Sequence, residues 1–160
     1  EVQSALNEGS SFWFILTLPT CQKPLPIDHN QYKKTTKLNI LAAEDNAINQ
    51  LIIEKLIVKL GHKATIVNNG QEALEILKKV NFDFVFMDCD MPVLDGYQAV
   101  KQFREYEESN QLVHLPIFAL TAHAYKDHDL KVKEFGMDGQ VLKPIKPTEI
   151  EELLNSIKIN

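Results

Sequence analysis

The chain has 160 residues, of which 44% are hydrophobic and 24% are charged, and its formal net charge is −5. This composition is typical of a globular protein with a sizeable core and excludes extended disorder, while the acidic balance argues against general binding to nucleic acid. Cys21 and Cys89 are too few and too far apart for a disulfide framework or a metal motif, so we expect a reducing, cytoplasmic environment.

The amino-terminal part of the chain holds a short apolar run, residues 12–18. This run is too short to cross a membrane. Glu1 and Glu8 precede it, where a signal peptide carries basic residues, so we expect no signal peptide. The stretch from Pro19 to Lys37 is rich in proline and polar residues and is predicted to be a linker.

From residue 38 onward, short apolar runs that suit buried strands alternate with amphipathic patterns that suit helices. The predicted strands are residues 38–43, 64–67, 82–87, 116–120 and 141–142. The predicted helices are residues 46–60, 73–80, 96–107, 126–135 and 148–157. In the first helix, Ile48, Ile52, Leu56 and Leu60 fall at fourfold spacing and are predicted to form the buried face.

Five strand–helix units in succession predict a parallel sheet with helices on both faces. For a domain of this size we expect an α/β fold, a flavodoxin-like (βα)5 three-layer sandwich with strand order 2-1-3-4-5. In this order the chain reverses direction between strands 1 and 3. A crevice therefore opens at the carboxyl ends of these strands, where open sheets bind ligands.

Acidic side chains leave the strands at this crevice, Glu44 and Asp45 after the first strand and Asp88 after the third. Three converging carboxylates raise one another's pKa values unless a hard cation such as Mg²⁺ binds them. Thr121 and Lys143 end the fourth and fifth strands and are predicted to approach from the other side. A carboxylate attacks phosphorus when such groups neutralise the phosphoryl oxygens, so Asp88 is the candidate nucleophile.

These residues lie in motifs that resemble those of response-regulator receiver domains. The similar segments are LNILAAEDN (38–46), FMDCDMPVLDG (86–96), ALTA (119–122), GMD (136–138) and LKPI (142–145). They occur in the order of the family, each near a predicted strand end, and the resemblance covers about three quarters of the chain.

The resemblance implies that Asp88 accepts a phosphoryl group from a phosphohistidine. It further implies a Mg²⁺ site in which the side chains of Asp45 and Asp88 bind directly, Asp90 binds through its backbone carbonyl and Glu44 binds through water.

Two further residues gain roles from the same resemblance. Thr121 and Lys143 are implied to contact the phosphoryl oxygens, and the Lys143–Pro144 peptide bond is implied to be cis, which is largely a property of X-Pro bonds.

The sequence departs from the family pattern at the position three residues before Lys143. Receiver domains usually carry Tyr or Phe there, a ring that reports phosphorylation to a partner surface, whereas this chain carries Gln140. We therefore expect a weaker or different conformational switch. The side chains of Asp90 and His123 take the positions that flank the hydrolytic water in the family, and we expect them to set the lifetime of the phosphorylated Asp88.

Residues 7–19 resemble the end of a histidine-kinase ATP-binding domain, where a Gly-Ser-x-Phe turn leads into a final aromatic strand. The expected organisation is a kinase remnant at 1–19, a linker at 20–37 and a receiver domain at 38–158. The chain then resembles the carboxyl-terminal receiver of a hybrid sensor histidine kinase, and it is a phosphoacceptor and not itself a kinase.

The resemblance also implies partners. A sensor histidine kinase domain would supply the phosphoryl group and a histidine phosphotransfer protein would receive it, with no nucleic acid and no membrane contact by this segment. We expect a cytoplasmic location, with a parent kinase that could be anchored in the inner membrane.

Two other functions agree less well with the sequence. Asp88-Cys89-Asp90 resembles the Asp-x-Asp motif of haloacid-dehalogenase-like hydrolases, which suggests a Mg²⁺-dependent aspartyl phosphatase, although that family places the motif after its first strand. A flavodoxin-like ligand binder would need a loop that cradles phosphate, and the acidic Glu44–Asp45 pair repels phosphate there.

Overall fold

The computed structural model describes residues 2–5, 9–12, 37–122 and 126–156, which belong to two units, residues 1–34 and 35–160. In the first unit, β1 (Val2–Ala5) pairs antiparallel with β2 (Gly9–Phe12). The predicted aromatic strand after Phe12 and the predicted linker, apart from Lys37, lie outside the described residues. Within the described residues, no helix combines the length and the apolar character that a membrane span needs.

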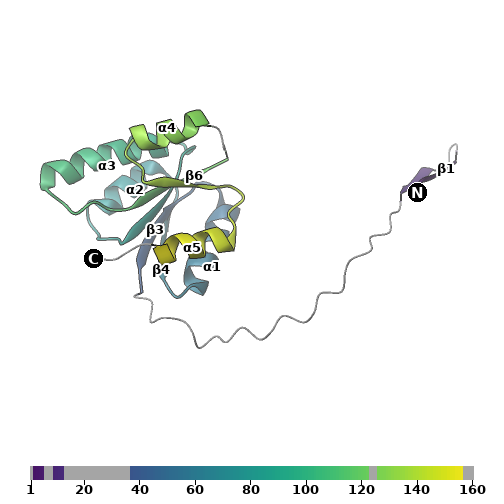
Figure 1. Cartoon of the computed structure of the whole chain (residues 1–160), viewed down its shortest axis with the longest axis horizontal. Helices are drawn as coiled ribbons and strands as arrows, with labels where there is room; N and C mark the ends of the chain where they lie inside the picture. Colours follow the sequence, from purple (N-terminus) through teal and green to yellow (C-terminus); the bar gives the residue numbers. More distant parts are fainter. Residues whose placement is uncertain (1, 6–8, 13–36, 123–125, 157–160) are drawn as a thin grey trace. The chain divides into compact units, whose positions relative to one another are not determined.

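The second unit is a parallel sheet of five strands between two layers of helices (Figure 1). The strands are β3 (Asn39–Ala43), β4 (Lys63–Val67), β5 (Phe84–Asp88), β6 (Ile117–Thr121) and β7 (Gly139–Leu142). The helices are α1 (Ala47–Lys59), α2 (Gly70–Leu77), α3 (Gly96–Asn110), α4 (Lys126–Glu134) and α5 (Pro147–Ser156). The spatial order β4-β3-β5-β6-β7, parallel at each pairing, confirms the predicted order 2-1-3-4-5.

The two faces of the sheet form two separate cores because successive side chains of a strand point to opposite sides. In β5, Val85 and Met87 pack with residues of α2, α3 and α4. Phe84 and Phe86 point the other way and pack with residues of α1 and α5. All four side chains are buried, as expected for a central strand covered on both faces.

The buried face of α1 differs from the prediction. Ile53 and Ile57 are fully buried against the sheet, whereas Ile48 is 70% exposed and Ile52 is 43% exposed. Both pairs follow fourfold spacing, because α1 carries apolar residues on two adjacent stripes. Spacing alone cannot choose between such stripes.

The second helix also ends earlier than predicted. Asn69 caps α2 by accepting the N–H of Glu72 at 2.9 Å, and the helix ends at Leu77. Val80, predicted to lie on its apolar face, comes after the helix and is 43% exposed. The cap therefore sets the start of α2 ahead of the first apolar residue, and Val80 belongs to the turn that follows the helix.

An ion-pair cluster ties α3 to the amino-terminal ends of β6 and β7. Arg104 pairs with the buried Glu107 and, at 3.0 Å, with Asp138, and it donates to the Gly136 carbonyl at 2.8 Å. Asp138 also accepts the N–H of Ile117, the first residue of β6, at 2.8 Å. This cluster lies at the edge of the sheet opposite the predicted crevice, so it belongs to the architecture of the domain.

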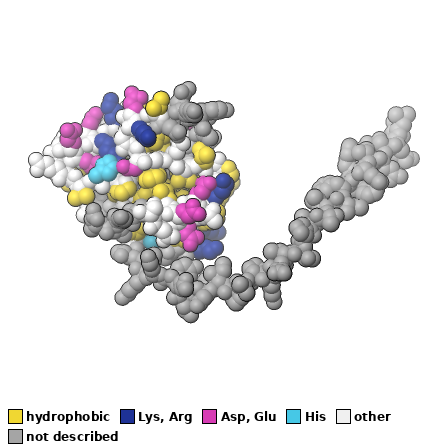
Figure 2. All heavy atoms as spheres, viewed as in Figure 1, with side chains coloured by type: hydrophobic (Ala, Val, Ile, Leu, Met, Phe, Trp, Pro, Cys, Tyr) yellow, Lys and Arg dark blue, Asp and Glu magenta, His cyan; other side chains and the backbone are white. Residues whose placement is uncertain are grey.

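Basic and acidic side chains are both present on one face of the second unit (Figure 2). On the face that Figure 2 shows, basic side chains are interspersed with acidic ones over the described residues. A nucleic-acid-binding surface gathers basic side chains on one face. The face drawn in Figure 2 shows no such gathering of basic side chains over the described residues.

Candidate functional site

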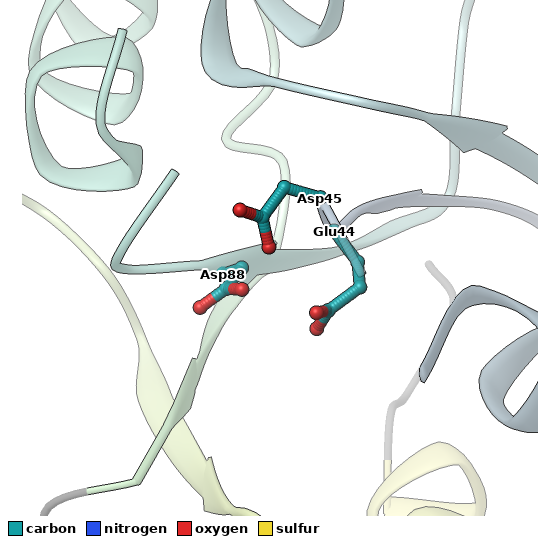
Figure 3. A group of neighbouring side chains, drawn as sticks. All are labelled: Glu44, Asp45 and Asp88. Atoms are coloured by element: carbon teal, nitrogen blue, oxygen red, sulfur yellow. The ribbon is translucent and has the colours of Figure 1, made fainter. Parts of the chain in front are cut away.

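Three carboxylates meet at the carboxyl-terminal edge of the sheet. Glu44 and Asp45 directly follow β3, and Asp88 is the last residue of the neighbouring strand β5. Each offers an oxygen that lies within 4.8 Å of the others, and Figure 3 shows the three side chains around one space. Glu44 and Asp88 are buried and Asp45 is exposed. A cluster of hard oxygen donors, open on one side, suits Mg²⁺, which keeps several of its waters.

Lys143 closes the buried side of this cluster. It follows β7, and its backbone N–H donates to the carbonyl of Thr121 at 2.7 Å. Its ammonium lies 2.6 Å from Oδ2 of Asp88 and 2.7 Å from Oε2 of Glu44. The Lys143–Pro144 bond is cis, as the resemblance implied.

The pKa values of this pair follow from burial and charge. Burial raises the pKa of the Asp88 carboxyl, and the charge of Glu44 raises it further, against the opposing effect of Lys143. Burial lowers the pKa of Lys143, but its hydrogen bonds to Asp88 and Glu44 outweigh that effect and raise the pKa above its ordinary value. The lysine is therefore a fixed positive charge between two buried carboxylates.

The loop after Asp88 is held close to the site by backbone contacts. The Asp90 N–H donates to Oδ1 of Asp88 at 3.2 Å, and the Gly96 N–H donates to the Cys89 carbonyl at 3.2 Å. A Cβ atom on Gly96 would lie 2.0 Å from the Asp88 carbonyl oxygen. Only glycine therefore allows α3 to begin this close to Asp88. Asp95 caps the helix by accepting the N–H of Gln98 at 2.8 Å.

The remaining predicted residues take different places. Thr121 is buried and ends β6, the strand next to β5, so it lies at the same edge of the sheet as Asp88. The Asp90 side chain is exposed. Gln140 is half-buried in β7, paired in register with Ala119. His123 lies outside the described residues.

Sequence reasoning missed two side chains that contact Glu44. The Asn49 amide donates to Oε1 of Glu44 at 2.9 Å, and the Gln50 amide donates to the Glu44 carbonyl at 2.6 Å. Both lie in the first turn and a half of α1. The available signal was a pair of amides on the helix that directly follows the acidic pair.

The fold and the site together define a receiver domain of two-component signalling. The chain belongs to the response regulator receiver domain family, which it matches over residues 40–155.

The curated relatives are histidine kinases much longer than this chain, and several of them are hybrid histidine kinases. Hybrid signal transduction histidine kinase K of Dictyostelium discoideum is 34% identical over 161 residues, a match that covers 95% of this chain and 13% of the relative. Hybrid signal transduction histidine kinase I of the same organism is 40% identical over 122 residues, 73% of this chain and 7% of the relative. The chain thus spans only a small part of the relatives it matches.

Solved structures agree with this assignment. The receiver domain of sensor histidine kinase PA1611 from Pseudomonas aeruginosa, solved with a magnesium ion in its active site cleft, is 35% identical with a TM-score of 0.67 and covers 75% of this chain and 96% of that one. The receiver domain of Ssk1 from Saccharomyces cerevisiae was crystallised with the histidine phosphotransfer protein Ypd1. It is 32% identical with a TM-score of 0.72, and the match covers 74% of this chain and 87% of that one.

Proposed function

We propose that this domain takes a phosphoryl group from a phosphohistidine onto Asp88 in the presence of Mg²⁺ and passes it to a histidine phosphotransfer protein. The observation that carries this proposal is the cluster of Glu44, Asp45 and Asp88 with the Lys143 ammonium against two of the three carboxylates. A structural ion pair would need one carboxylate; the surplus of negative charge suits a divalent cation and, with it, a phosphoryl group.

In this proposal each residue of the site has its own role. A carboxylate oxygen of Asp88 forms the new bond to phosphorus while the bond between phosphorus and the histidine nitrogen breaks, and the imidazole leaves with the electron pair. When bound, Mg²⁺ neutralises charge on the phosphoryl oxygens. Asp45 and Asp88 would hold it through their carboxylates, Asp90 through its carbonyl and Glu44 through water.

Thr121 and Lys143 act on the phosphoryl group itself in this proposal. The Lys143 ammonium, already 2.6 Å from Asp88 Oδ2, pairs with a phosphoryl oxygen once the carboxylate becomes an acyl phosphate. Thr121 supplies a hydroxyl donor from the neighbouring strand. The exposed Asp90 side chain and His123 would set how fast water removes the phosphoryl group. If Asp90→Ala and His123→Ala lose the phosphoryl group at the same rate as wild type, this role is refuted.

The proposed partners rest on the relatives. Matches to hybrid histidine kinases suggest that this chain is the receiver portion of such a kinase, with a kinase remnant at 1–19 and a linker at 20–37. A phosphotransfer protein was crystallised with the receiver domain of Ssk1, which suggests the same class of acceptor here. Because Gln140 replaces the usual aromatic ring, we further propose that phosphorylation changes the surface near α4 less than in other receivers.

Labelling with acetyl phosphate tests the function. With Mg²⁺ present, the full chain should gain one phosphoryl group on Asp88, and Asp88→Asn should gain none. Asp90→Asn, which keeps the backbone carbonyl and removes the neighbouring carboxylate, should still be labelled. Continuous turnover of a general phosphomonoester, with no stoichiometric labelling of Asp88, would instead support the aspartyl phosphatase.

A further inference from the structure

The two carboxylate oxygens of Glu44 are held by different parts of the fold. Oε2 lies 2.7 Å from the Lys143 ammonium, on the side of β7. Oε1 accepts the Asn49 amide at 2.9 Å, on the side of α1, and the Asn46 backbone N–H at 3.3 Å. Glu44 is only 1% exposed, so water does not replace these donors. Its carboxylate orientation is therefore set by protein groups, and Asn49 is the side-chain donor to Oε1 among the described contacts.

The backbone of Glu44 is held from the same helix. The Gln50 amide donates to the Glu44 carbonyl at 2.6 Å and to Oδ1 of Asn68 at 3.1 Å. Asn68 directly follows β4, and its backbone N–H and side-chain amide both donate to Glu72 of α2. The backbone of the segment that carries Glu44 and Asp45 is thus fixed to the end of β4 and to α2. The Glu44 carboxylate itself is held by Lys143 at Oε2 and by the Asn46 N–H and the Asn49 amide at Oε1, of which the Asn49 amide is the shorter contact.

We propose that Asn49 is a positioning residue that orients the Glu44 carboxylate and thereby sets the affinity of the acidic cluster for Mg²⁺. This inference rests on the proposed function. Carboxylates in metal sites are themselves hydrogen-bonded, and these outer partners tune affinity. An amide is well suited to this task, because it is neutral: it holds Oε1 without cancelling the negative charge that attracts the cation. A lysine or arginine at position 49 would neutralise Glu44 instead.

The matched variant is Asn49→Leu, which keeps the branching and the number of heavy atoms of the half-buried side chain and removes its donor. Asn49→Gln keeps an amide on a longer stem. The control is Asn110→Leu, because the Asn110 amide donates to the Tyr106 carbonyl of its own helix at 2.8 Å, at the far end of α3. Thermal unfolding without Mg²⁺ shows which variants fold, and Asn49→Ala replaces Asn49→Leu if leucine does not fit.

Calorimetric titration of the full chain with MgCl₂ alone is the first measurement. Asn49→Leu should bind Mg²⁺ about tenfold more weakly than wild type, which is the lower end of such outer-partner effects, and Asn49→Gln should fall between the two. Asn110→Leu should match wild type. The second measurement is acetyl-phosphate labelling against Mg²⁺ concentration: in Asn49→Leu the half-maximal concentration should rise, while the rate at saturating Mg²⁺ should not change.

The outcomes distinguish a failure of this inference from a failure of the proposed phosphoacceptor function on which it rests. If wild type binds Mg²⁺ and is labelled while Asn49→Leu binds equally well, the positioning role is wrong and the proposed function stands. Equal losses in Asn49→Leu and Asn49→Gln would overturn the role of the amide, as would a lower labelling rate at saturating Mg²⁺ with unchanged affinity. If wild type neither binds Mg²⁺ nor becomes labelled, the proposed function and this inference both fall.

Discussion

The ammonium of Lys143 lies 2.6 Å from Oδ2 of Asp88, although the two residues are 55 positions apart in the sequence. The same ammonium reaches Glu44, so one lysine neutralises part of the charge of the two buried carboxylates in the cluster, Glu44 and Asp88. A buried charge is tolerated only when it is paired. Lys143 therefore has two effects that oppose each other: it stabilises the fold without metal, and it repels any cation that binds to the same carboxylates.

Replacing Lys143 by methionine should separate these two effects. Without Mg²⁺, Lys143→Met should lower the free energy of unfolding by about 3 kcal/mol, because two buried carboxylates lose their positive partner. Its affinity for Mg²⁺ should rise, because the repelling charge is gone, while labelling by acetyl phosphate should slow. Urea unfolding and calorimetric Mg²⁺ titration measure the two effects.

The control for this prediction is Lys146→Met. Lys146 pairs with Glu149 at 3.1 Å, but its side chain is 66% exposed, and exposed pairs contribute less than about 1 kcal/mol. This variant should match wild type in both measurements. A Lys143→Met variant that binds Mg²⁺ more weakly than wild type would contradict the electrostatic argument.

Much of the site could be predicted because of where its residues stand in the sequence. Glu44, Asp88 and Lys143 each end or follow an apolar run, and parallel strands bring such ends to one edge of a sheet. Individual side-chain contacts were harder to predict from the sequence. The bond from Asn49 to Glu44 depends on the rotation of α1 about its axis, and the two apolar stripes of α1 made that rotation ambiguous. The spacing of the stripe that contains Ile52 predicted the wrong face.

Substitutions on α1 check this corrected face. Ile53→Ala should lower the free energy of unfolding by about 2 to 5 kcal/mol, because it removes a fully buried side chain and leaves a cavity. Ile52→Ala, one position earlier in the same helix, should cost less than about 1 kcal/mol, because Ile52 is 43% exposed. Chemical denaturation of both variants suffices. Equal losses would mean that the helix packs through both stripes.

The link from Arg104 to the ends of β6 and β7 was not predictable from spacing, because two of its partners, Gly136 and Asp138, are 32 and 34 residues away along the chain. Arg104→Ala should lower the free energy of unfolding by about 3 kcal/mol, since the buried Glu107 loses its positive partner and Asp138 loses one of its donors. Lys101→Ala, exposed on the same helix, is the control and should stay within about 0.5 kcal/mol of wild type. Thermal unfolding with an unchanged midpoint in Arg104→Ala would show that the cluster is dispensable.

His62 should make stability depend on pH. Burial lowers its pKa below the ordinary value of 6.5, and Nδ1 accepts the backbone N–H of Leu38 at 3.3 Å, so the fold favours the neutral imidazole. Because the unfolded chain takes up the proton first, this contribution is fully present above pH 6.5 and declines as the pH falls toward the lower folded pKa. His62→Gln retains an acceptor for Leu38 without the titration. Urea unfolding measures the free energy of unfolding near pH 8 and near pH 5.5. Between these two values, wild type should lose more stability than His62→Gln, and equal losses in the two proteins would exclude His62 as the source of the pH dependence.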